Sequence, residues 1–231
     1  MNFILQGFYE AMRLLFTGDS ATYEIALRSL EVSAVALAVS LVLGVPAGTA
    51  IALAHFPGRR FVVAVINTGM GVPPVVVGLI VALFLWRTGP LGSLGLMYTL
   101  QAMIIAQVLI ALPIVAGLSL AALQQLDQGF RLQIMALGAG RWRTFLLLIR
   151  EIRVPLMAAV MAGFGGAISE VGASMMVGGN LAGETRVLTT AVMLEVSRGD
   201  FAVAMALSMI LLVLIFIVNA ILTSVQQQEK M

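Results

Sequence analysis

The sequence contains no cysteine and a single histidine, His55, among its 231 residues. Without cysteine, disulfide bonds and thiolate-ligated metal sites are excluded, and one histidine cannot build a histidine cluster. We therefore expect no metal site and no cofactor. Lys230 is the only lysine among 13 basic residues, and the formal net charge is +2. Because the basic residues are scattered instead of gathered into a strip, nucleic-acid binding is not expected.

Charge is scarce as well: 10% of the residues are charged and 61% are hydrophobic, with a mean hydropathy of +1.06. This composition lies outside the range of soluble domains, so lipid is the expected solvent. The sequence lacks a basic segment followed by a short apolar run and a cleavage pattern, so we expect no signal peptide and a full-length mature chain. No Gly-x-x-x-x-Gly-Lys-Ser/Thr stretch occurs, so ATP hydrolysis by the P-loop route would need a partner chain.

Five apolar stretches reach the roughly 20 residues that a helix needs to cross hydrocarbon. Four of them contain no charged residue, and the fourth in order contains Glu170. Because lipid cannot satisfy free backbone polar groups, the pattern predicts an all-α membrane protein, a helical bundle in one domain over residues 1–231. The predicted spans are Val32–Ala54, Phe61–Trp86, Tyr98–Leu123, Val154–Val177 and Phe201–Val225.

Arginine placement predicts the orientation of the bundle. Arginines gather in the connection between the first and second spans and in that between the third and fourth, whereas the second connection contains only Arg87. By the positive-inside rule, the arginine-rich connections face the cytoplasm. We expect a multi-pass protein of the inner or plasma membrane, with its amino terminus outside and its carboxyl terminus, with Lys230, inside.

Two further segments are predicted to form helices that do not cross the membrane. In the N-terminal segment, residues 1–25, Phe8 and Met12 share one face of an amphipathic helix that stops at residues 17–19. This helix is expected either to lie on the outer membrane surface or to pack against a neighbouring span. The apolar run Val187–Val196 is too short to cross, and it predicts a partly re-entrant or interfacial helix on the outer side.

Proline and glycine interrupt the spans unevenly. Pro73 and Pro74 break the second span, and the fourth span combines many glycines with Ser169, Glu170 and Ser174. The glycine-rich helix is predicted to line a path. For Glu170 two interpretations stand: a buried structural acceptor of hydrogen bonds, or a carboxylate that helps a gate to move.

The connection 127–153 is too polar to span and too patterned for a plain linker. Phe130, Ile134 and Leu137 form one apolar edge of a predicted short helix, and Gly138 is its predicted left-handed C-cap. A short helix across the inner surface can act as a lever, because a partner that grips it tilts the attached spans.

Residues 135–144, Met-Ala-Leu-Gly-Ala-Gly-Arg-Trp-Arg-Thr, resemble the conserved cytoplasmic loop of permease subunits in binding-protein-dependent ABC importers. The glycine of the family pattern falls on Gly138, whereas its opening Glu-Ala-Ala is replaced by Leu-Gln-Ile at 132–134. In that family the short helix docks into a groove on the ATPase. The resemblance implies an ATPase-coupling set of Ala136, Leu137, Gly138, Ala139, Arg141 and Trp142.

Residues 167–180 and the Thr-Arg-Val-Leu-Thr-Thr run at 185–190 are similar to molybdate, tungstate and sulfate permeases, and most like the tungstate branch. The resemblance implies import of a tetrahedral oxyanion, tungstate first, by alternating access. The implied partners are two ATPase subunits, an extracytoplasmic oxyanion-binding protein and a second copy of the chain. The predicted translocation path or gate comprises Ser169, Glu170, Ser174, Thr185, Arg186, Thr189 and Thr190.

Two other classes of function remain open at this point. An ion-coupled secondary transporter needs intramembrane ionisable residues and usually repeated halves, but only Glu170 qualifies and no repeat is visible. An intramembrane enzyme needs a nucleophile with a base, or a metal cluster at depth, and the sequence offers few candidates. Co-purification with an ATPase would separate the importer from both alternatives.

Overall fold

The computed structural model describes residues 2–16 and 19–228, and every regular element within these ranges is a helix. Within these ranges three helices are long and apolar enough to cross a membrane, and counting each of two bent helix pairs as one span gives up to five crossings. The predicted all-α membrane bundle is confirmed. Residues 17–18, where the N-terminal helix was expected to stop, and Lys230 lie outside the described residues.

Helix α2 (Ser20–Leu53) begins well before the predicted first span. The Asp19 carboxylate accepts hydrogen bonds from the Thr22 hydroxyl at 2.6 Å and the Thr22 amide at 2.9 Å, which caps the helix start. These two hydrogen bonds hold the pKa of Asp19 below its ordinary value. The 34 residues of α2 rise about 51 Å, compared with roughly 30 Å of hydrocarbon, so its first turns project beyond the membrane core.

The second and fourth predicted spans are each two helices instead of one. Helices α3 (Arg59–Met70) and α4 (Pro74–Leu85) meet at 100° across a break at Pro73 and Pro74, which lack the amide hydrogens that would continue the helix. Helices α8 (Arg153–Ile168) and α9 (Gly172–Gly178) meet at 55° without any proline.

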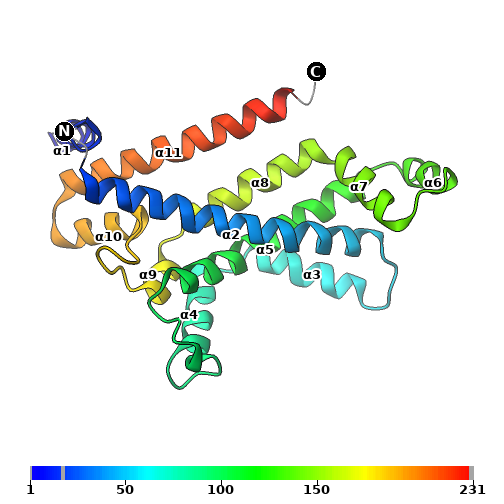
Figure 1. Cartoon of the computed structure of the whole chain (residues 1–231), viewed down its shortest axis with the longest axis horizontal. Helices are drawn as coiled ribbons and strands as arrows, with labels where there is room; N and C mark the ends of the chain where they lie inside the picture. The colour runs from blue at the N-terminus through cyan, green and yellow to red at the C-terminus, as the bar shows by residue number, and fades with distance from the viewer. Residues whose placement is uncertain (1, 17–18, 229–231) are drawn as a thin grey trace.

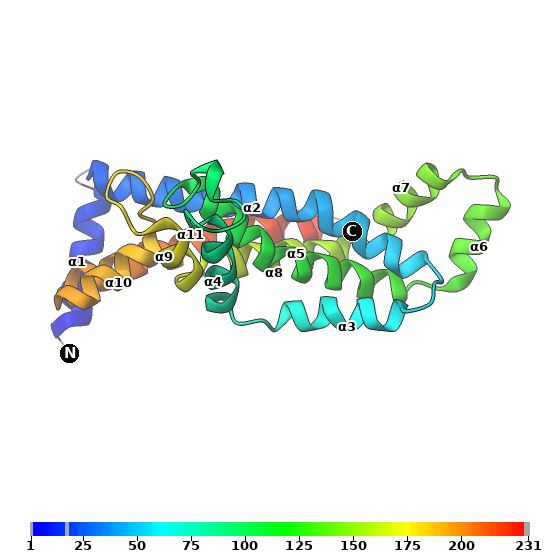
Figure 2. The same cartoon turned by 90° about the horizontal axis from the view of Figure 1, so that it is seen from below.

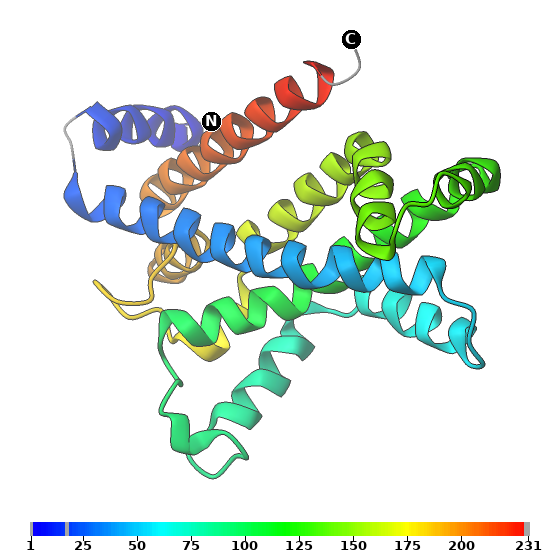
Figure 3. The same cartoon turned by 45° about the vertical axis from the view of Figure 1, so that its right-hand side comes forward.

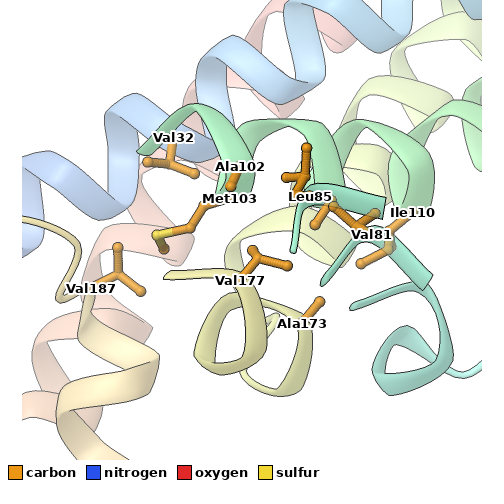
Figure 4. Close-up of a cluster of buried hydrophobic side chains, with 10 residues drawn as sticks. Val32, Val81, Leu85, Ala102, Met103, Ile110, Ala173, Val177 and Val187 are labelled. Atoms are coloured by element: carbon orange, nitrogen blue, oxygen red, sulfur yellow. The ribbon is translucent and has the colours of Figure 1, made fainter. Parts of the chain in front are cut away.

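The central core joins the second helix of each broken span, α4 and α9, to the unbroken helices α2 and α5 (Leu100–Gln124). In Figure 4, Val32, Met103, Val81 and Val177 come from four different helices and point toward one another. Helices α4 and α9 pack closely against each other, since a Cβ on Gly78 would lie 2.5 Å from the Cα of Ala173.

The two ends of the bundle carry different helices (Figures 1 and 2). At one end, the α1 end, α1 (Asn2–Phe16) runs across the direction of the long helices, and α10 (Leu188–Arg198) lies at the same end of the bundle. At the opposite end, the loop end, lie α6 (Gln128–Ala136) and α7 (Arg141–Glu151). The short 3-10 helix η1 (Gly92–Leu94) lies in the connection between α4 and α5. Figure 3 shows α11 (Phe201–Gln228) diverging from α2 toward its carboxyl end. The predicted helix near Val187–Val196 is confirmed as α10.

Helix α1 uses two faces differently. A Cβ on Gly7 would lie 2.4 Å from the Met205 side chain, and Ala11 is buried, so the small-residue face packs on α11. Phe8 and Met12, on the face predicted to be buried or lipid-facing, are 57% and 40% exposed. Packing against a neighbouring span is therefore confirmed, but through a different face, and the exposed face stays available for lipid.

Candidate coupling turn and translocation path

The turn after α6 has the geometry that its glycine predicts. Gly138 has φ = 75°, the Leu137 amide donates to the Gln133 carbonyl at 3.0 Å, and the Ala139 amide donates to the Ile134 carbonyl at 3.3 Å. The Leu137 bond is the last ordinary helical hydrogen bond, and the Ala139 bond is the 6→1 bond that marks a Schellman-type helix end. Gly138 is thus confirmed as a left-handed C-cap.

The apolar edge of α6 is smaller than predicted. Ile134 is buried and Phe130 packs against the same cluster, but Leu137 is 88% exposed. The prediction was wrong for Leu137 because the helix ends at Ala136, so that Leu137 belongs to the turn and follows a different direction.

The candidate coupling turn, residues 136–142, and the helix before it present apolar side chains to their surroundings. Trp142 is 70% exposed and stacks on Phe145 with the ring centroids 5.5 Å apart. Leu132 is 65% exposed. Among the other predicted coupling residues, Ala136, Gly138 and Arg141 are exposed and Ala139 is half-buried. Exposed apolar groups of this kind suit contact with lipid or with another protein.

A separate helix, α7, follows the turn where the sequence reasoning expected only a reversal into the fourth span. Leu148 and Ile152 are 2% and 1% exposed, and they pack with Ile134 and Leu123 in one cluster. The spacing of Phe145, Leu148 and Ile152 was the available signal for this helix.

A cleft of about 530 Å³ lies at the loop end of the bundle, next to α6 and α7. Its walls come from the ends of α2 and α5, the start of α3, and α6 and α7. The lining residues are Ala52, Leu53, His55, Arg59, Leu123, Gln124, Leu126, Asp127, Leu132 and Leu148. Helix α6 packs on the bundle through Ile134 and Phe130, in the cluster that also contains Leu123 and Leu148.

Glu170 lies at the break between α8 and α9 and is 6% exposed. Its Oε1 accepts a hydrogen bond from the Ala173 amide at 2.6 Å, and its backbone carbonyl accepts one from the Thr189 hydroxyl at 2.9 Å. The carboxylate therefore supplies the acceptor for one of the amides at the start of α9, which explains a helix break that contains no proline. This geometry favours the interpretation of Glu170 as a buried structural acceptor of hydrogen bonds over the interpretation as part of a gate.

The threonines of the predicted path bond within the subunit. The Thr185 hydroxyl donates to the Gly178 carbonyl at 2.5 Å and accepts from the Leu181 amide at 3.0 Å, and Thr190 accepts from the Val187 amide at 3.1 Å. All three path threonines are buried, Thr185 and Thr189 at 2% and 7% exposure and Thr190 at 0%.

The two serines of the predicted path differ. Ser174 is 1% exposed, and its hydroxyl has no hydrogen-bond partner within the described part of the chain. Ser169 is exposed, and its hydroxyl donates to the Gly165 carbonyl at 2.6 Å.

Arg186 is half-buried, and its Nε donates to the Asn180 side chain at 3.2 Å. The structure brings Arg28 of α2 to the same loop, where its guanidinium donates to the Gly183 carbonyl at 2.8 Å. Sequence reasoning did not single out Arg28, because it precedes the predicted first span.

The exposed face of α8 differs from that of α11. Pro155, Ala158, Ala162 and Ser169, spaced by three to seven residues, are small and exposed. The exposed side chains of α11 are large, as Phe216 at 73% shows. Large apolar groups suit lipid, whereas a small-residue face suits close helix approach or a polar path.

Comparison with known proteins identifies relatives of this chain. The chain is 40% identical over 228 residues to the tungstate uptake system permease protein TupB of Peptoclostridium acidaminophilum, covering 99% of this chain and 100% of that protein. It is 43% identical over 198 residues to a probable anion ABC transporter permease protein of Haloferax volcanii, covering 84% and 85%.

Among solved structures, a chain of the MetNI methionine ABC transporter in an inward-facing conformation superposes with a TM-score of 0.77. The sequence identity is 19%, and the superposition covers 92% of this chain and 98% of that chain. This likeness shows that the fold is shared. The family described as binding-protein-dependent transport system inner membrane component matches residues 40–229. The chain is a multi-pass membrane protein that belongs to this family of transport components.

Proposed function

We propose that the chain is the permease subunit of an ABC importer for a tetrahedral oxyanion, with tungstate as its cargo and molybdate or sulfate as alternatives. The assignment of the cargo rests on the 40% sequence identity to the tungstate uptake permease, which extends over 99% of this chain. Hydrolysis of ATP belongs to a partner, because the sequence has no P-loop. The proposed assembly contains two copies of this chain, two ATPase subunits and an extracytoplasmic oxyanion-binding protein.

The proposed ATPase contact is the coupling turn. Leu137 and Trp142 are exposed on either side of Gly138, and Arg141 adds positive charge beside them. A protein groove that buries these side chains would gain apolar area and hold the turn firmly. Because α6 adjoins the cleft, movement of the gripped turn would pass to α5 and α8.

The proposed path runs along the small-residue face of α8, between two copies of the chain. This face ends at Ser169, whose hydroxyl is exposed, next to the break that Glu170 caps. Five crossings are few for a closed path, so a second copy related by a two-fold axis would complete it. The buried threonines would then support the path instead of touching the anion.

The proposed orientation has the loop end in the cytoplasm and the amino terminus outside, in the inner or plasma membrane. Arg141 and Arg143 lie at the loop end, together with Arg59 and Arg60 at the start of α3. This distribution follows the positive-inside rule.

Uptake by proteoliposomes tests the proposal. The complex, reconstituted with its ATPase and supplied with loaded binding protein, should accumulate tungstate only with ATP, and molybdate and sulfate should be tested as competitors. Uptake without an ATPase, driven by an ion gradient, would favour a secondary transporter and overturn the proposal.

A further inference from the structure

The loop between α9 and α10, residues 179–187, is held by two arginines, one from α2 and one from the loop itself. Arg28 of α2 donates from Nη2 to the Gly183 carbonyl at 2.8 Å and from Nη1 to the Arg186 carbonyl at 3.4 Å. Arg186 donates from Nε to the Asn180 side-chain oxygen at 3.2 Å and from Nη2 to the Asn180 carbonyl at 3.3 Å. The two guanidinium groups are thus bound to one short loop at the α1 end.

The charge of this arginine pair is poorly compensated. Its hydrogen-bond acceptors are neutral oxygens, and the nearest carboxylate oxygen within the described chain is that of Glu24, 3.9 Å from Arg28 and on a side chain 62% exposed. At the same end of the bundle, Arg198 pairs directly with Glu195 at 2.9 Å. The Arg28 side chain is only 14% exposed, so water screens its charge less than that of a surface arginine.

A guanidinium group matches the geometry of an oxyanion. Each one has five N–H donors, and Arg28 and Arg186 each use two on the loop. Bonds from arginine to an anionic oxygen are about twice as strong as bonds between neutral groups, so a dianion can compete with the carbonyl contacts. The threonine hydroxyls nearby, such as that of Thr185, are already paired inside the subunit.

We propose that Arg28 and Arg186 form an oxyanion-receiving site at the α1 end, where the cargo first meets the permease. This proposal rests on the proposed function, because it assigns the site to the transported anion. The arginine pair raises the local concentration of dianions, and its loop contacts keep the two guanidinium groups in place while the site is empty. The first contact is therefore charged, whereas the stretch beyond it along α8 is lined by small residues that release the anion.

The test compares uptake by four variants in the complete complex. Arg28→Gln and Arg186→Gln remove one charge each, Arg28→Lys keeps the charge but loses the fork of donors, and Arg198→Gln is the control from a carboxylate-paired arginine. Proteoliposomes with ATPase and saturating loaded binding protein are assayed for initial tungstate uptake at low and at physiological ionic strength.

Electrostatic focusing of this kind raises capture rates by about 10-fold or more, and salt weakens it. We expect the initial rate of tungstate uptake by both glutamine variants to be about tenfold below that of the wild type at low ionic strength. Uptake by these variants should also lose most of the salt dependence that the wild type shows. Arg28→Lys should keep most of the rate, and Arg198→Gln should match the wild type.

Two results would overturn the site. Equal losses in Arg28→Lys and Arg28→Gln, with unchanged salt dependence, would show that the arginines only hold the loop. Wild-type uptake in the glutamine variants would show that the pair contributes nothing. Failure of the proposed function looks different, because the wild-type complex itself would then take up no oxyanion with ATP, and the site would fall with it.

Discussion

Replacement of Gly138 by valine tests the coupling turn through backbone strain alone. Gly138 has φ = 75°, and a Cβ added there meets nothing within 4 Å. The substitution therefore introduces no steric overlap with the bundle, and its effect comes from the left-handed backbone. This conformation costs a non-glycine residue about 1–2 kcal/mol, and a β-branched residue tolerates it least.

The strain would shift the turn toward other conformations. Since about 1.4 kcal/mol corresponds to a factor of ten, we expect Gly138→Val to reduce transport-coupled ATP hydrolysis about tenfold while the protein still inserts and assembles. Gly138→Asn should keep most of the activity, because asparagine visits the left-handed region readily. The assay is ATP hydrolysis in proteoliposomes, with and without loaded binding protein.

Gly140→Ser is the matched control for this prediction. Gly140 also has open space around its Cβ position, but its φ is −65°, and serine is a favourable residue at the start of a helix such as α7. We expect wild-type coupling in this variant. Normal coupling in Gly138→Val, or equal losses in both variants, would refute the reasoning.

Three further predictions concern hydrogen bonds in other parts of the chain. Glu170→Gln should keep uptake, because the amide oxygen can still accept from the Ala173 amide, whereas a loss of uptake in an assembled complex would favour the gating role. Thr185→Val keeps the side-chain shape but leaves two backbone groups unpaired, so the free energy of unfolding should fall by about 1–3 kcal/mol. The complex should then unfold at a lower temperature in a thermal melt. Asp19→Ala removes a helix cap worth about 1 kcal/mol, which faster amide exchange at Thr22 would reveal. Because the folded pKa of Asp19 is lowered, its stabilisation is present above its unfolded value of about 3.9 and is lost as the pH falls through the folded value, so the two proteins should converge in acid.

The length of the apolar stretches predicted the membrane crossings but not the bends within two of them. The Pro73–Pro74 pair indicated a break in the second span, yet no sequence rule gave the 100° angle, which depends on how α4 packs against α9. The break at Glu170 was invisible because it has no proline. A side-chain acceptor caps α9 there, and that contact exists only in the folded chain.

The candidate coupling turn was easier to predict than the path. Gly138 is read from local chemistry, because a left-handed helix end needs a residue without a Cβ. The path residues are polar groups in or beside the spans, and their residue type does not distinguish packing from passage. Thr185 and Thr190 turned out to bond within the subunit, and Arg28 reached the loop only through tertiary contact.

Labelling of a single cysteine at Leu137 tests the central claim most directly, because the natural sequence has no cysteine to interfere. Leu137→Cys is treated with a membrane-impermeant maleimide in intact cells and in inverted membrane vesicles. We expect labelling only in inverted vesicles, and protection of this cysteine when the ATPase is bound. Labelling from outside intact cells, or equal labelling with and without the ATPase, would contradict the assignment of this turn as the motor contact.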